Sequence, residues 1–105
     1  MPYLPRGVAE PAELVKTLNA LAPFPPGVVN FRYTVDEDWS GDPAIFFWIT
    51  LSDEAARRTS LPQTARRVTK FVTERVDPSG KWGLIPYFNF RSQSEQAKLK
   101  EEVFG

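Results

Sequence analysis

The chain has 105 residues, with 13 basic and 13 acidic side chains and neither cysteine nor histidine. This composition excludes disulfides, thiolate nucleophiles, Cys or His metal sites and imidazole bases, and the balanced charge gives no overall attraction to nucleic acid or anionic membranes. The length suits one domain, residues 1 to 105, that folds without a metal. We expect a soluble, cytoplasmic protein with no membrane segment.

The first elements in chain order are an arm, a helix and a stiff corner. Residues 1 to 10 carry two prolines and little periodicity, which predicts an irregular N-terminal arm. A helix should begin near Pro11, because proline suits the first helical turn. Its apolar residues recur at helical spacing: Leu14, Val15, Leu18, Leu21 and Ala22. Pro23 should end it, and residues 23 to 27 (PFPPG) should direct the chain into a strand.

Residues 28 to 52 predict two strands joined by an acidic turn. The first strand has one apolar face, formed by Val29, Phe31, Tyr33 and Val35. The second strand carries one apolar face made of Ile45, Phe47, Ile49 and Leu51. Its opposite face contains Phe46 and Trp48. Because both faces are apolar, we expect the second strand to be central in the sheet.

A cap, a short turn and a long helix should follow. Ser52 can cap a turn that contains two acids. Ser60 and Gln63 then form a capping-box pattern at the start of a helix. The apolar residues of this helix are Leu61, Ala65, Val68, Val72 and Val76. Their spacing predicts a helix that lies across the sheet.

The last third of the chain predicts a turn, a strand and a helix. Asp77-Pro78-Ser79-Gly80 is a turn sequence, and 84 to 90 (LIPYFNF) should form a third strand at the sheet edge because of Pro86. Ser92 or Ser94 should cap a final helix that reaches Val103. Its apolar content is thin, so we expect the segment 92 to 105 to dock loosely or to complete its burial on another chain.

The resulting order is α-β-β-α-β-α. It predicts an α+β fold in which a single antiparallel sheet of about three strands has helices packed on one face.

The acidic turn between the two strands resembles part of a calcium-binding loop. Asp36, Asp38, Ser40 and Gly41 match the first half of that loop, but Phe47 stands where position 12 needs a glutamate, and the flanks are strands. We therefore predict a structural turn and assign no metal ligand. Magnesium binding by the carboxylates of residues 36 to 42 is the alternative. Trp39 has no local core, which indicates a partner contact or packing back on the domain.

Two further surfaces are candidates for binding. The basic segment contains no acid and is formed by Arg57, Arg58, Arg66, Arg67 and Lys70. It could recognise phosphate or nucleic acid, or serve as a solvated helix face. The outward side of the sheet should carry Phe46 and Trp48 beside Arg32, an arrangement that could stack bases or bury against a second subunit.

No catalytic or cofactor-binding pattern is present. Ser79-Gly80-Lys81 lacks the upstream glycine of a phosphate-binding loop, and no acid-base pair stands at a spacing that demands catalysis. We therefore assign no catalytic residue and no cofactor, and interpret the chain as noncatalytic.

The apolar residues exceed what one three-stranded sheet with one covered face can hide. The leading interpretation is therefore a small protein-interaction or regulatory module that acts as a homodimer or complex subunit, with Trp39, Phe46, Trp48 and Arg32 on its partner surface. The first alternative is a nucleic-acid-binding module that uses the sheet aromatics and the basic segment. The second alternative is a metal-dependent hydrolase or transferase centred on the acidic turn.

Overall fold

The computed structural model describes residues 11 to 104, so the predicted N-terminal arm lies outside the described residues. The helices are α1 (Pro11–Asn19), α2 (Leu61–Arg75), α3 (Pro78–Trp82) and α4 (Gln93–Phe104). The strands are β1 (Val28–Glu37), β2 (Pro43–Leu51) and β3 (Ile85–Ser92). The predicted α+β class is confirmed. None of the described helices is both long and apolar enough to span a membrane.

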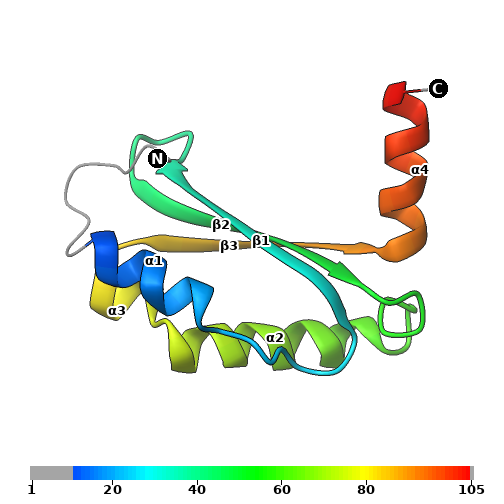
Figure 1. The fold of residues 1–105 in the computed structure, drawn as a ribbon, viewed down its shortest axis with the longest axis horizontal. Helices are drawn as coiled ribbons and strands as arrows, with labels where there is room; N and C mark the ends of the chain where they lie inside the picture. The colour runs from blue at the N-terminus through cyan, green and yellow to red at the C-terminus, as the bar shows by residue number, and fades with distance from the viewer. Residues whose placement is uncertain (1–10, 105) are drawn as a thin grey trace.

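The three strands form one sheet in the order β1-β2-β3, so β2 is central and β3 lies at an edge, as predicted. β1 and β2 pair antiparallel, but β2 and β3 pair parallel, and the expectation of an antiparallel sheet is wrong. The reason is the path of α2 and α3, which carry the chain back along the sheet to the end where β2 began (Figure 1). β3 therefore starts beside the start of β2 and runs in the same direction.

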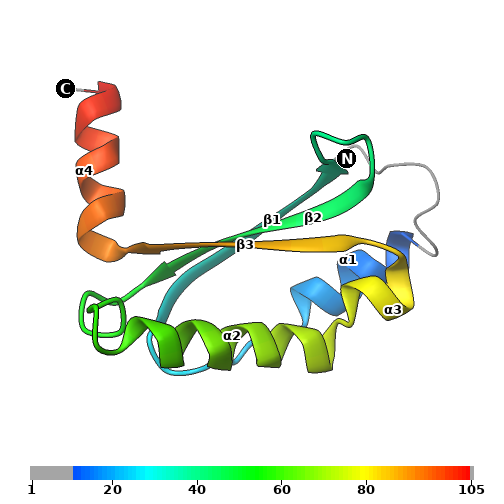
Figure 2. The same ribbon diagram turned by 180° about the vertical axis from the view of Figure 1, so that it is seen from behind.

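Helices α1, α2 and α3 lie on one side of the sheet, whereas α4 rises on the other side from the end of β3 (Figures 1 and 2). The prediction that the helices pack on one face is therefore wrong for α4. The covered face of the sheet is the one that faces α1, α2 and α3. Its central strand contributes the predicted core residues, all buried: Ile45, Phe47, Ile49 and Leu51. They belong to one cluster with helix residues that include Leu14, Leu18, Val68 and Val72.

One residue predicted for the core face of β1 is not buried. Val29 is 49% exposed, because the pairing of β1 with β2 shifts between Val28 and Asn30. Such a bulge leaves one residue without a partner opposite it. Val28 instead packs against the core cluster.

The predicted caps have different outcomes. Ser52 does cap the turn after β2, since its Oγ accepts a hydrogen bond from the Ala55 amide at 3.2 Å. The predicted capping box between Ser60 and Gln63 is wrong, because Ser60 stands at the N-cap of α2 without a side-chain hydrogen bond. The Thr64 hydroxyl instead donates to the Ser60 carbonyl at 3.0 Å.

The segment predicted as a turn at residues 77 to 80 begins a short helix, α3. Asp77 adopts a left-handed conformation with φ of 50°, and its side chain accepts a hydrogen bond from the Gly80 amide at 3.2 Å. At the end of α3, the indole N–H of the buried Trp82 donates to the Val76 carbonyl at 3.0 Å. α3 thus places a tryptophan in the core, which the turn prediction missed.

Candidate functional site

The side of the sheet that faces away from α1, α2 and α3 is not covered by them, and we call it the open face. The pleat and the register assign every second residue of each strand to it. β1 contributes Asn30, Arg32, Thr34 and Asp36; β2 contributes Ala44, Phe46, Trp48 and Thr50; β3 contributes Ile85, Tyr87, Asn89 and Arg91. This register places Phe46 and Trp48 opposite the buried face of β2, as the sequence predicted.

A continuous line of aromatic rings crosses the open face, and we call it the aromatic row. It consists of Trp39, Tyr87, Phe46 and Trp48. Successive ring centroids are 5.1 Å apart from Trp39 to Tyr87, 5.2 Å from Tyr87 to Phe46 and 6.4 Å from Phe46 to Trp48. Trp48 is 38% exposed and Trp39 is 80% exposed, so the row presents a stacking surface to solvent.

The acidic turn holds Trp39 at the end of this row through Asp38. The Asp38 carboxylate accepts hydrogen bonds from the amides of Ser40 at 2.9 Å and Asp42 at 3.0 Å. Its other oxygen accepts the Tyr87 hydroxyl at 2.9 Å, which joins the turn to β3. The turn therefore has a structural function that is visible in its hydrogen bonds.

The hydrogen bond between Tyr87 and Asp38 shifts the pKa of both side chains. Desolvation raises the pKa of Asp38, but the hydrogen bonds from Asp42, Tyr87 and Ser40 outweigh it and hold that pKa below its ordinary value. The hydrogen bond to Asp38, followed by desolvation, raises the pKa of the Tyr87 hydroxyl. Within residues 11 to 104, no three carboxylates lie together as a group that could hold a metal ion.

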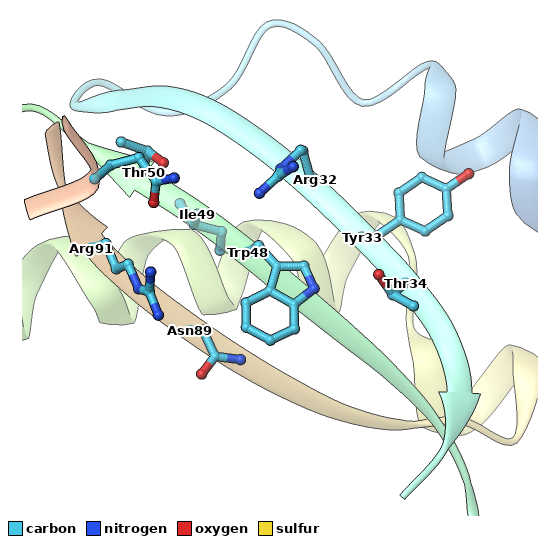
Figure 3. Close-up of a pocket in the computed structure, with 9 residues that line it drawn as sticks. Arg32, Tyr33, Thr34, Trp48, Ile49, Thr50, Asn89 and Arg91 are labelled. Atoms are coloured by element: carbon cyan, nitrogen blue, oxygen red, sulfur yellow. The ribbon is translucent and has the colours of Figure 1, made fainter. Parts of the chain in front are cut away.

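The other half of the open face contains a shallow hollow of about 500 Å³, which we call the arginine groove. The residues that line it include Arg32, Trp48, Asn89, Arg91 and Gln96, the last from α4. Figure 3 shows the side chains of Arg32 and Arg91 extending from the outer strands toward the middle strand, where Trp48 lies. Among the described residues, no acidic side chain lines the groove and neither arginine forms a salt bridge. The groove can therefore accept a flat or anionic group.

The basic segment lies away from the open face. Arg66, Arg67 and Lys70 are exposed on α2, and Arg57 and Arg58 are exposed in the turn before it. α2 lies on the opposite side of the sheet from α4 (Figure 2). Lys70 forms a salt bridge with Glu74 at 3.9 Å. None of these five residues lines the arginine groove, so the two surfaces proposed for nucleic acid are distinct.

Helix α4 borders the arginine groove and is fixed at its base. Ser92 and Glu95 form a reciprocal capping box, in which the Glu95 amide donates to Ser92 Oγ at 3.0 Å and the Ser92 amide donates to Glu95 Oε1 at 3.3 Å. The Ser94 amide donates to Asp53 at 2.9 Å, and its hydroxyl donates to the other Asp53 oxygen. The two hydrogen bonds from Ser94 lower the pKa of Asp53.

Four residues of this site were missed in the sequence: Tyr87, Asn89, Arg91 and Gln96. The signal for the first three was present, because they alternate with Phe88 and Phe90 along β3 as polar and apolar faces do. Gln96 offered no signal, since its place beside the groove depends on the direction in which α4 leaves the sheet. Comparisons with protein-family models, curated proteins and solved structures found no match to this chain.

Proposed function

We propose that this protein is a noncatalytic interaction module that assembles as a homodimer through its open face. The observation that carries the proposal is the uncovered aromatic row. Among the described residues four large apolar side chains are exposed, and Trp39, Trp48 and Ile85 are three of them, all on or beside the open face. A contiguous apolar surface of this kind marks an interaction site more often than a solvated surface.

Association would remove much of this surface from water. Covering the exposed part of Trp48, roughly 90 Å² of a side chain that presents up to about 250 Å², contributes about 2 kcal/mol. Trp39 is more exposed and would contribute more. The polar surroundings also fit an interface, because Arg32, Arg91 and Asn89 flank the rings as a polar rim flanks an apolar centre.

The test is the effect of Trp48→Arg on assembly. A charge in the middle of the aromatic row should leave the fold intact and convert a dimer to a monomer, as measured by analytical ultracentrifugation at about 100 µM, well above the Kd of a modest interface. Thr73→Arg adds the same charge on the exposed side of α2 and should leave the dimer unchanged. A monomeric parent protein at this concentration overturns the proposal.

The arginine groove favours a second candidate function, binding of single-stranded nucleic acid. The observation behind it is that two arginines without salt-bridge partners among the described residues extend toward one exposed indole. An aromatic ring can stack a base, at about 1 to 3 kcal/mol per base, while the guanidinium groups neutralise phosphates.

Two matched double variants test this candidate. Arg32→Glu with Arg91→Glu should weaken binding of a fluorescent single-stranded RNA and reduce the salt dependence of the binding that remains. Arg66→Glu with Arg67→Glu makes the same charge change on α2 and should leave binding in place. The opposite result assigns binding to the basic segment, and a parent protein that binds no RNA at 50 mM salt removes the candidate.

A further inference from the structure

Two features project from opposite ends of the open face. At one end, α4 rises from the end of β3; at the other, the β1–β2 turn carries Trp39 (Figures 1 and 2). Both are on the side of the sheet opposite α1, α2 and α3. Hydrogen bonds fix the base of each feature. Ser94 at the start of α4 donates to Asp53, and Tyr87 donates to Asp38 in the turn. Their projection is therefore part of the fold.

The length of α4 is compatible with a second β-sheet packed on the open face. Twelve residues form a helix of about 18 Å, whereas two packed sheets lie about 10 Å apart. A second sheet on the open face would therefore end beside the shaft of α4. An isolated helix of this length is marginal in water, so a contact along its shaft would stabilise it. Ala97 and Lys98 on this shaft are exposed.

The charges on the open face are divided between the same two ends. Arg32 and Arg91 lie in the half next to α4, and Asp36 lies in the half next to the turn. Asp42 in the turn is exposed and adds to the acidic end. If a second copy faced the first with its strands in the same direction, like charges would meet. If its strands ran in the opposite direction, each basic end would meet an acidic end.

We infer that the two copies of the homodimer proposed above pack face to face with a two-fold axis that runs across the strands. This arrangement places the acidic turn of each copy at the arginine groove of the other. It also places the partner's Trp39 against α4, so the features at the two ends cover one another. The inference rests on the proposed function and adds to it the orientation of the partner and the chemistry of the contact.

Engineered cysteines test the orientation, because the natural chain contains none. One chain carries Gln96→Cys at the base of α4, and a second, tagged chain carries Ser40→Cys in the acidic turn. After subunit exchange and mild oxidation, the mixture should give a disulfide between the two chains on a non-reducing gel, and neither chain alone should dimerise covalently. If Gln96→Cys links to itself and the mixed product is absent, the strands run in the same direction and the inference is overturned.

Charge reversal gives a second measurement that needs no oxidation. Arg32→Glu with Arg91→Glu, and separately Asp36→Lys with Asp42→Lys, should each raise the dimer Kd by about tenfold or more. An equimolar mixture of the two variants should form a mixed dimer of nearly parental Kd. A parent that dimerises while each double variant alone keeps the parental Kd overturns the orientation alone, because like charges would then already face each other in the parent. A monomeric parent overturns the proposed function as well, so the two failures are distinguishable.

Discussion

The two faces of the sheet both carry aromatic rings, but in different proportions of phenylalanine, tyrosine and tryptophan. The covered face is built mostly on phenylalanines, with Tyr33 packed beside them. Its ring centroids are 5.0 Å apart for Phe47 and Phe88 and 5.5 Å for Phe31 and Phe47. Phe24 stacks on Phe31 at 4.7 Å and extends this cluster toward α2. The open face carries two tryptophans, one tyrosine and one phenylalanine in the aromatic row.

This difference follows from what each ring needs when water is removed. Phenylalanine has no polar atom, so helices can cover it without supplying a hydrogen-bond partner. Tryptophan and tyrosine combine apolar area with a donor, which suits a surface that is partly wet or is covered by a partner. Where the core does contain a tryptophan, Trp82, its indole N–H has the Val76 carbonyl as acceptor. The comparison supports a core on one face and an interaction surface on the other.

The largest expected effect on stability comes from two neighbouring truncations on β2, which compare the covered face with the open face. Phe47→Ala removes a fully buried ring and should lower the free energy of unfolding by about 3 to 5 kcal/mol, because it leaves a cavity among helix and sheet side chains. Phe46→Ala removes a partly buried ring from the open face and should cost less, about 1 to 2 kcal/mol in a monomer, while weakening self-association. Urea denaturation at low protein concentration measures the first effect, and ultracentrifugation measures the second.

The two substitutions share residue type and strand, so their difference isolates the face of the sheet. Equal losses of monomer stability would mean that the open face is already covered within one chain. That outcome would contradict the assignment of the aromatic row to a partner surface.

A smaller effect on stability is expected at the start of α4, which is hydrogen-bonded to the turn after β2. The bonds from Ser94 lower the pKa of Asp53 in the folded protein, so their stabilisation is complete above the unfolded pKa of about 3.9 and is lost as pH falls through the folded value. Ser94→Ala should raise the pKa of Asp53 toward its ordinary value. It should therefore reduce stability slightly at pH 6 and not at all at the lowest pH where the fold persists.

The carboxyl carbon shift of Asp53, followed by NMR from pH 6 to pH 2, measures this pKa directly. Glu54 is exposed in the same turn and forms no hydrogen bond with the described side chains of α4, so Glu54→Gln is the control. An unchanged Asp53 titration in Ser94→Ala would show that α4 is not tied to this turn in solution.

Local sequence patterns predicted several features because they depend on a short length of chain. The alternation in 45 to 51 identified the buried face of β2, and Pro86 identified β3 as an edge strand. The serine cap at Ser52 was also predicted, since it joins residues three positions apart. One local pattern failed: no capping box forms at Ser60 and Gln63, whereas Ser92, predicted as a possible cap, forms one with Glu95.

The sequence by itself determined the α+β class, the central position of β2 and the faces of its side chains, because the pleat fixes alternation within each strand. The tertiary structure decided the parallel direction of β3, the contact of Trp39 with Tyr87 and the meeting of Arg32 and Arg91 around Trp48. These features join residues far apart in the chain, 49 positions in the bond between Asp38 and Tyr87. Only the path of α2 and α3 across the sheet sets which strand edges pair, and no local period in the sequence records that path.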